Sequence, residues 1–346
     1  MDNPVDELDA PLRRSTIRDV AADAGVSTAT VSRVLNRSAG VAPETRALVL
    51  NAIEQHRFTG RRKRRQQPQA HGVVTVRCPY VLSDYFGLII SGVARSLRLH
   101  GKSLLLSDDH HDGDEPSLAD EVSADFTEGA ILILPPEPPS VLEDLRSRGY
   151  PFVVVDPCYA LPADVAAVSA AHMAGARAAT EHLIQLGHSR IATITIRGNP
   201  VSADGRLMGY RGALAATGRL APGEFVSVAD EPDVASGLAA ARQLLDLRQR
   251  PTAILAYNDK IALAVLQVAA ERGLEVPRDL SVVGFDGLEL SQSVVPRLTT
   301  VRQPLEEMAR MAVGLLVRLM EGRDIHTLHV ELATELVIGA STGPPR

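Results

Sequence analysis

The spacing of apolar residues changes near residue 72. Before that point, apolar residues recur three and four positions apart in short segments, which is typical of small amphipathic helices. After it, short and nearly continuous apolar runs alternate with longer amphipathic stretches. Such runs predict strands of parallel sheets that are buried on both faces, and the stretches between them predict the covering helices. We therefore expect a helical head followed by a doubly wound parallel α/β region with enough strands for two lobes.

The α/β pattern is clear enough to place individual elements. The expected strands are 73–76, 103–106, 130–134, 152–155, 191–196, 225–228, 253–256 and 281–285. The expected helices between them are 87–100, 172–186, 205–217, 234–247 and 259–272. In this architecture a ligand binds at the carboxyl ends of the strands, which here means a cleft between two lobes.

Residues 16–36 predict two short helices joined by a tight turn. Thr16 and Asp19 have the spacing of a capping box, which begins a helix. Gly25 stands where the chain must turn, and Ser27 is suited to cap the second helix. This shape fits a DNA major groove, and the alternative is an ordinary two-helix corner inside a core.

A third helix is expected from Pro43 to about residue 56, because proline suits the first helical position. The second helix would direct Val31, Val34 and Leu35 at the first helix and leave Thr28, Ala29, Ser32 and Arg33 facing outward. The third helix would bury Leu48, Val49, Ala52 and Ile53, with Phe58 closing the core. The expected head is therefore a three-helix unit.

The charge distribution supports a DNA partner although the net charge of the chain is −6. From Arg13 to Arg65 there are 12 Lys/Arg and 4 Asp/Glu, which gives this segment a net charge of +8. The rest of the chain has 24 Lys/Arg and 38 Asp/Glu, a net charge of −14. The basic segment ends in a polar linker that includes Arg61, Arg62, Arg64 and Arg65. We expect these arginines to neutralise DNA phosphates; a solvated tether without fixed contacts is the alternative.

Polar residues follow several of the expected strands. Tyr85 and Phe86 come after the first strand, and Asp156 follows the strand 152–155. Arg206 comes after the strand 191–196 and its loop. Asn258 and Asp259 follow the strand 253–256, and Asp286 follows the strand 281–285. Carboxylates accept hydroxyl hydrogen bonds and arginine donates in a fixed fork, so together they suit a polyhydroxylated ligand. An Asp after a strand is as often a helix cap, and this remains the equal alternative for Asp259.

Composition limits the class of protein further. The chain contains no apolar run of roughly 18 residues that would span a membrane, and its N-terminus has no apolar signal segment, so we expect a cytoplasmic protein. Cys78 and Cys158 lack metal-ligand spacing and are expected to be thiols. A cluster near residue 110 could bind a metal, but an exposed acidic loop is favoured; its residues are His110, His111, Asp112 and Asp114. No phosphate loop, dinucleotide fingerprint or nucleophile elbow occurs, so we expect no cofactor and no enzyme.

A series of motifs runs in order through the chain. They are residues 17–21 and 30–36, Thr45-Arg46, His182-Leu-Ile-Gln-Leu-Gly-His188, Arg206-x-x-Gly209-Tyr210, Asn258-Asp259-x-x-Ala262, Gly273-Leu-Glu-Val-Pro277, Val282-Val-Gly-Phe-Asp286 and Leu298-Thr-Thr-Val301. This series resembles the LacI/GalR family of bacterial transcription regulators from about Thr16 to Thr342. The resemblance implies a helix-turn-helix head and a two-lobed, periplasmic-binding-protein-like sensor domain.

The resemblance also implies a domain plan. The acidic composition of Met1 to Pro11 indicates a disordered leader over 1–14. The head would cover 15–58, a basic hinge 59–71, and the effector-binding and dimerisation domain 72–346. The N-lobe would consist of about 72–171 and 304–324, and the C-lobe of about 172–303 and 325–342. The hinge departs from the family, because Gly60 replaces a common proline and Gln67 stands where a leucine usually enters the minor groove, so we expect no leucine-driven kink of the DNA.

The sites implied by the resemblance fall on matching residues. Thr28, Ala29 and Arg33 occupy base-reading positions, and Arg33 could bind a guanine with two hydrogen bonds. The expected DNA contacts are Thr16, Ser27, Thr28, Ala29, Thr30, Ser32, Arg33, Asn36, Arg61, Arg62, Arg64 and Arg65. The expected effector contacts are Tyr85, Phe86, Asp156, Arg206, Asn258 and Asp286.

We therefore expect a homodimeric repressor that reads a pseudo-palindromic operator in double-stranded DNA and responds to a small-molecule effector, such as a sugar. It would have no membrane partner. The alternatives are a sugar-sensing protein without a DNA function, against which the basic head argues, and an enzyme, for which the chain lacks a paired nucleophile and base.

Overall fold

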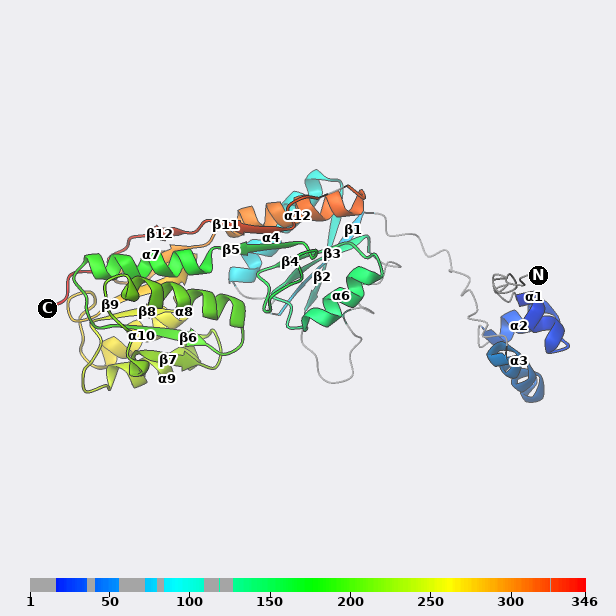
Figure 1. Cartoon of the computed structure of the whole chain (residues 1–346), viewed down its shortest axis with the longest axis horizontal. Helices are drawn as coiled ribbons and strands as arrows, with labels where there is room; N and C mark the ends of the chain where they lie inside the picture. The colour runs from blue at the N-terminus through cyan, green and yellow to red at the C-terminus, as the bar shows by residue number, and fades with distance from the viewer. Residues whose placement is uncertain are drawn as a thin grey trace, which may run out of the picture. The chain divides into compact units, whose positions relative to one another are not determined.

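The computed structural model describes residues 17–35, 41–55, 72–79, 84–108, 118, 127–323 and 325–346. The chain divides into a head unit, Met1–Gln69, and a larger unit, Ala70–Arg346, and each is described by itself (Figure 1).

The described residues of the head form three helices, α1 (Ile17–Asp23), α2 (Thr28–Leu35) and α3 (Pro43–Gln55). Gly25 makes the turn with a φ of 62°, a conformation that glycine adopts without steric cost. The Thr30 amide donates a hydrogen bond to Ser27 Oγ at 3.2 Å, so Ser27 caps α2 as predicted. The small core of the head consists of Val20, Ala21, Val31, Val34, Val49 and Ala52.

The buried face of α3 differs from the prediction at one position. Leu48 was expected in the core, but 58% of its surface is exposed, whereas Val49 is fully buried. Successive residues lie about 100° apart around a helix, so the stripe that contains Val49, Ala52 and Ile53 turns Leu48 toward solvent. The prediction for Leu48 was therefore wrong, while Val49 and Ala52 are confirmed as core residues.

The larger unit contains two sheets, each six-stranded in the described residues. The first has the order β11-β5-β4-β3-β1-β2 and is parallel throughout. Its strands are β1 (Val73–Cys78), β2 (Ser103–Asp108), β3 (Gly129–Ile133), β4 (Phe152–Val155), β5 (Ala167–Ala170) and β11 (His329–Leu332). The second has the order β12-β10-β9-β8-β6-β7, in which only β12 runs antiparallel. Its strands are β6 (Ile191–Ile196), β7 (Val226–Ala229), β8 (Ala253–Ala256), β9 (Ser281–Asp286), β10 (Thr299–Arg302) and β12 (Glu335–Val337).

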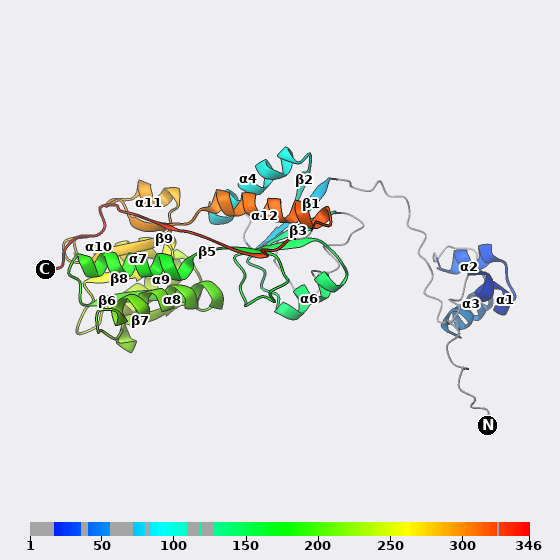
Figure 2. The same cartoon turned by 45° about the horizontal axis from the view of Figure 1, so that its top comes forward.

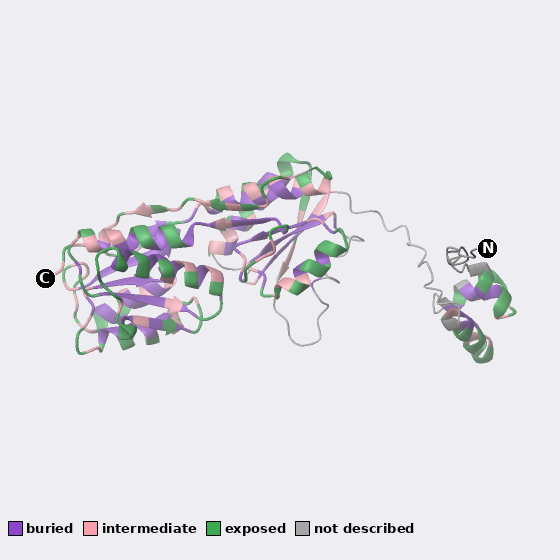
Figure 3. Ribbon diagram, viewed as in Figure 1, coloured by how far each residue is buried: buried purple, intermediate pink, exposed green. Residues whose placement is uncertain are grey.

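Helices cover both faces of each sheet, which leaves the central strands buried between them (Figures 1 and 3). In the first lobe, α4 (Asp84–Leu99) and α12 (Leu305–Met320) pack on one face and α6 (Pro139–Ser147) on the other. In the second lobe, α7 (His172–Gln185) and α8 (Pro200–Ala215) cover one face, as Figure 2 also shows, and α9 (Val234–Leu245) and α10 (Asp259–Glu271) cover the other. Two short elements complete the described set, the 3-10 helix Gly223–Phe225 and α11 (Glu289–Ser293).

The doubly wound architecture agrees with the sequence analysis, and some boundaries differ. The helix expected over 205–217 begins at Pro200, because the Asn199 side chain accepts a hydrogen bond from the Ser202 amide at 3.2 Å and proline suits the first turn. Strands β5, β10, β11 and β12 were not predicted, since they have only three or four residues and lack a long apolar run.

The expected lobe boundary also needs a correction. Residues 325–342 were assigned to the C-lobe, but β11 lies beside β5 in the first sheet, with His329 opposite Ala167. After α12 the chain therefore adds an edge strand to the first lobe before β12 joins the second. In the described part of the chain, the connection between the lobes is made after β5, after β10 and after β11.

The close packing of α7 against α8 generates a stability prediction. A Cβ atom at Gly209 would lie 2.8 Å from the Arg177 amide nitrogen and still nearer to the Met173 carbonyl oxygen, so α8 has no room for it. We expect Gly209→Ala to lower the free energy of unfolding by about 1–3 kcal/mol, as overpacking does. Urea unfolding of the full chain measures this change.

The matched control is Gly212→Ala in the same helix. A Cβ at Gly212 would meet no atom within 4 Å, so alanine should raise the free energy of unfolding by about 0.5–1 kcal/mol through its helix propensity. Equal effects of the two substitutions would contradict this account of the α7–α8 contact.

Candidate functional site

The second helix of the head presents the predicted base-reading positions to solvent. Thr28, Ala29 and Arg33 are exposed on α2, while Val31 and Val34 are buried in the head. The hydroxyl groups of Ser27 and Thr30 are 2.9 Å apart at the start of this helix. Six of the expected DNA contacts lie outside the described residues: Thr16, Asn36, Arg61, Arg62, Arg64 and Arg65. Only the backbone of Ser32 is described.

The first lobe contributes a buried carboxylate to a polar network. Asp156 follows β4 and is 3% exposed. Its Oδ1 accepts a hydrogen bond from the Ala170 amide at 3.1 Å and lies 3.2 Å from His172 Nε2, and its Oδ2 accepts one from the Tyr85 hydroxyl. Burial acts to raise the pKa of Asp156, but His172, Tyr85 and the Ala170 amide outweigh it and hold this pKa below its usual value.

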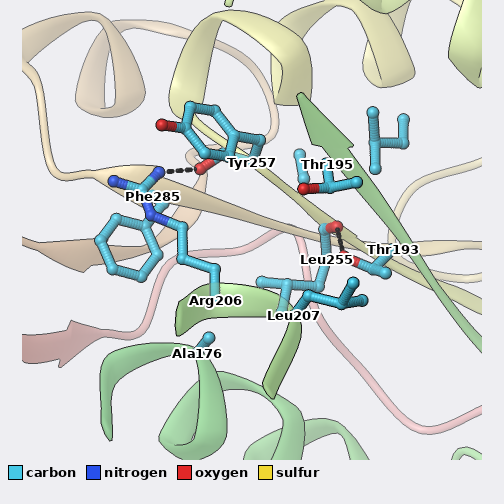
Figure 4. A pocket seen from close by; sticks show the side chains of 10 residues that line it. Ala176, Thr193, Thr195, Arg206, Leu207, Leu255, Tyr257 and Phe285 are labelled. Carbon is cyan, nitrogen blue, oxygen red and sulfur yellow. Dashed lines mark hydrogen bonds between the residues drawn. The ribbon is translucent and has the colours of Figure 1, made fainter. Parts of the chain in front are cut away.

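The second lobe contributes a buried guanidinium. Arg206, on α8, lies between two aromatic rings, with its Cζ 4.2 Å from the centroid of Tyr257 and 3.7 Å from that of Phe285 (Figure 4). Its Nη1 donates to the Tyr257 carbonyl, and its Nη2 lies 3.4 Å from His172 Nδ1. Cations are attracted to aromatic faces, so the two rings and the carbonyl compensate part of the cost of burying this charge.

His172 joins the two parts of the network. Arginine can only donate, so His172 Nδ1 must accept from Arg206, and the ionised Asp156 can only accept, so Nε2 must donate. The tautomer with its proton on Nε2 satisfies both neighbours. A hydrogen-bonded path therefore connects Tyr85 and Asp156 of the first lobe with Arg206 of the second.

Asp286 is the second carboxylate of the network. It ends β9, and its Oδ1 accepts from Gln303 Nε2 at 2.7 Å and lies 3.7 Å from Arg206 Nη2. Burial raises the pKa of Asp286 above its usual value, although Arg206 and Gln303 act to lower it. The carboxylate of Asp156 also raises this pKa, which indicates that the two aspartates sense each other's charge.

Two buried polar atoms beside Asp286 have no hydrogen-bond partner. They are Nε of Arg206, a donor, and Oε1 of Gln303, an acceptor. Unpaired buried polar groups are uncommon in folded proteins and mark places where water or a ligand binds. Arg206 also lines a cavity together with Thr193, Leu255 and Phe285 (Figure 4). The cavity has a volume of about 10 Å³, enough for about one water molecule, and Asp156, Asp286 and Gln303 are not among its lining residues.

The network brings together four of the six expected effector residues, Tyr85, Asp156, Arg206 and Asp286. Phe86 instead belongs to the core of the first lobe, where its ring contacts that of Tyr85 edge to face at 5.2 Å. The side chain of Asn258 caps α10 by accepting from the Ile261 amide at 2.9 Å, and it donates to the Pro232 carbonyl at 3.0 Å. Asn258 rather than Asp259 is therefore the helix cap.

Four residues of the network were not predicted from the sequence: His172, Tyr257, Phe285 and Gln303. His172 follows β5 and Gln303 follows β10, two strands that the apolar pattern did not reveal. Phe285 lies within the motif that ends at Asp286, and Tyr257 directly precedes the motif that begins at Asn258. An aromatic residue at the end of a buried strand has no sequence signal that separates it from a core residue.

Other sequence expectations concern metals, thiols and membranes. Within the described ranges, no group of three His, Cys, Asp or Glu side chains could hold a metal ion, and residues 110–114 lie outside those ranges. Cys78 and Cys158 are buried thiols. No helix in the described part of the chain has the length and apolar character needed to cross a membrane.

Comparison with known proteins identifies the class. The chain matches the family model of bacterial regulatory proteins of the lacI family over residues 16–60 and that of a periplasmic binding protein-like domain over residues 180–342. It is 32% identical over 333 residues to the transcriptional repressor CytR of Escherichia coli (strain K12), which covers 95% of this chain and 96% of CytR.

Two solved structures share the fold. The complex of the transcriptional regulator CelR with cellobiose matches with a TM-score of 0.73 and 31% identity, over 95% of this chain and all of that one. The lac repressor dimer bound to operator and the anti-inducer ONPF matches with a TM-score of 0.71 and 27% identity, over 96% of this chain and all of that one. The chain belongs to the lacI family: it is a DNA-binding transcriptional regulator, and its relatives are regulators rather than enzymes.

Asp259 generates a prediction about pH. Its carboxylate is fully buried, where it accepts from Thr300 Oγ1 and from the Leu288 amide, and burial together with the charge of Asp286 raises its pKa to about 8. An unfolded aspartate titrates near pH 4, so between about pH 4 and 8 the folded state binds more protons, and the contribution of Asp259 to stability falls as pH rises. We therefore expect Asp259→Asn, which cannot ionise, to gain stability relative to the parent as pH rises toward 8.

Urea unfolding at pH 5.5, 7 and 8.5 measures the difference between Asp259→Asn and the parent. Asp204→Asn, on the exposed side of α8, is the control for loss of a negative charge. A relative loss of stability by Asp259→Asn with rising pH would contradict the prediction.

Proposed function

We propose that this regulator is a repressor whose affinity for operator DNA is set by a sugar, or a related polyhydroxylated metabolite, bound at the network between the lobes. The observation that supports this most directly is the unpaired donor on Arg206 and the unpaired acceptor on Gln303, which both flank Asp286. A hydroxyl group both donates and accepts, so one or two ligand hydroxyls could satisfy both atoms.

The charges at the site narrow the chemistry of the ligand. Asp156 and Asp286 can accept hydrogen bonds from further hydroxyls, and Arg206 is held in place by Tyr257 and Phe285. A neutral polyol suits two carboxylates and one guanidinium better than an anion does, because the site is already acidic. The regulator CelR, which has the same fold, was solved in complex with cellobiose, and this supports a sugar as the ligand class.

We infer that the head reads DNA with the exposed face of α2. Thr28, Ala29 and Arg33 would face bases in the major groove, while Ser27, Thr30 and Ser32 would contact phosphates. Thr16, Asn36 and the linker residues Arg61, Arg62, Arg64 and Arg65 would add phosphate or minor-groove contacts. The solved lac repressor is a dimer on its operator, which supports a homodimer with two heads and a pseudo-palindromic site for this chain. Operator binding would place its action in the cytoplasm.

Arg33 provides the test of direct readout. Selection from random duplexes defines the preferred operator, and competition binding then measures specificity. We expect Arg33→Ala to lose about 1–3 kcal/mol of specific affinity and to relax the preference at one base position, because the guanidinium can bind guanine O6 and N7 together.

Arg33→Lys is the matched control, because it keeps the charge and loses the planar fork. It should retain binding to random DNA but show the same relaxed preference as alanine. Unchanged base preference in both variants would exclude Arg33 as a reader of sequence.

The effector site is tested with the same operator fragment. A panel of monosaccharides, disaccharides and polyols that includes cellobiose is screened for its effect on operator affinity. We expect at least one compound to change the affinity by about tenfold, within the usual range of allosteric coupling. Arg206→Lys should abolish that response and leave sugar-free operator binding in place, whereas Arg211→Lys, exposed on the same helix, should keep both.

Two outcomes would refute parts of this proposal. A panel without any active compound would remove sugars as the ligand class. A response that persists in Arg206→Lys would remove the network as the binding site.

A further inference from the structure

Two aspartates occupy equivalent places in the two sheets. Asp156 directly follows β4, and Asp286 is the last residue of β9. Each of these strands pairs with the strand from which the chain crosses to the other lobe, β5 for Asp156 and β10 for Asp286. The two carboxylates therefore lie at matching positions next to two different crossings.

Both aspartates have a backbone conformation that most residues avoid. Their φ angles are 49° and 108°, in the left-handed region that favours glycine. Such conformations persist where the surroundings fix them, and they are frequent at functional and switching sites. The described residues contain one further example that is not glycine, Leu134 at the end of β3, which has an apolar side chain.

Asp156 is bonded to the first crossing. Its Oδ1 accepts from the amide of Ala170, the last residue of β5, at 3.1 Å, and it lies 3.2 Å from Nε2 of His172, the first residue of α7. These two residues span the step from the first lobe into the second. Asp156 thereby holds both ends of the first crossing with one oxygen atom.

Asp286 is bonded to the second crossing. Its Oδ1 accepts from Gln303 Nε2 at 2.7 Å, and its carbonyl oxygen accepts from the Gln303 amide at 3.1 Å. Gln303 lies between β10 and α12, where the chain returns to the first lobe. The next residue, Gly287, has no room for a side chain, since a Cβ there would lie 2.7 Å from Arg302. The end of β9 is thus packed closely against the second crossing.

We propose that Asp156 and Asp286 are paired positioning residues that fix the first and second crossings to their own lobes. A ligand hydroxyl that bonds to either carboxylate then shares its oxygen atoms with the bonds to the crossing. Occupancy of the site thus changes how firmly the crossings are held. This last step rests on the proposed function, whereas the attachment of the crossings to the two carboxylates does not.

Native-state hydrogen exchange of the full chain, without sugar or DNA, tests the attachment. Asp156→Gly removes the carboxylate and keeps the left-handed backbone accessible, and Asp286→Gly does the same at the second crossing. We expect exchange about tenfold faster at residues 167–172 in Asp156→Gly and at residues 301–305 in Asp286→Gly, since each variant loses hydrogen bonds to a charged group. Each variant should leave the other crossing unchanged.

Leu134→Gly is the matched control, because it relaxes a left-handed residue at a strand end without removing a carboxylate. Its side chain packs against the core of the first lobe, so it should accelerate exchange across that lobe without the local increase at residues 167–172 or 301–305. Two further variants keep the test decisive if a glycine variant fails to fold: Gln303→Leu removes the donor of the second crossing, and His172→Phe removes the imidazole nitrogens at the first. Each should accelerate exchange at its own crossing only.

The proposal is overturned if exchange at the crossings stays at the parent rate in these variants, or if it accelerates equally throughout the chain. Neither result depends on a sugar or an operator. A failure of the sugar screen therefore leaves this proposal standing, and a failure of the exchange experiment leaves the proposed function standing.

Discussion

The burial of the Arg206 guanidinium is the constraint around which the larger unit is organised. A cation that leaves water loses a large hydration energy, which partners within the protein must replace. Two aromatic faces and one carbonyl of the second lobe supply part of this, and the carboxylate of Asp286 supplies more. His172 then links the Arg206 guanidinium to the carboxylate of Asp156 in the first lobe. The same atoms that neutralise one buried charge therefore connect the two lobes.

The equivalence of the two sheets explains why this connection is possible. Each sheet is built in the same strand order, and a buried aspartate lies at the carboxyl end of the fourth strand along the chain in each lobe: Asp156 follows β4, and Asp286 is the last residue of β9. In parallel sheets the carboxyl ends of the strands form the ligand-binding edge. The strand next to each aspartate, β5 for Asp156 and β10 for Asp286, is the one from which the chain crosses to the other lobe. An aspartate at the ligand-binding edge can therefore also form a hydrogen bond to a crossing. The same carboxylate atoms thus lie at the ligand-binding edge and hold the connections between the lobes.

The sequence predicted those parts of the fold that rest on long, regular patterns. The buried strands of both lobes and the turn at Gly25 follow from apolar runs and from the freedom of glycine, and the structure agrees with them. Short strands such as β5 lack such a pattern, so His172 at its end was missed. Asp156 and Asp286 could be found because they follow clear strands. The role of Asn258 as a cap and the exposure of Leu48 depend on tertiary packing that neighbouring residues do not reveal.

The hydrogen bonds between the connections have a mechanical consequence. The Ala171 amide, in the first crossing, donates to the Leu332 carbonyl at the start of the third, with a distance of 2.9 Å. This bond ties the first connection to the third, so the two run side by side where they leave the first lobe. Proteolytic cleavage of any one of the three connections would leave the two lobes joined by the other two.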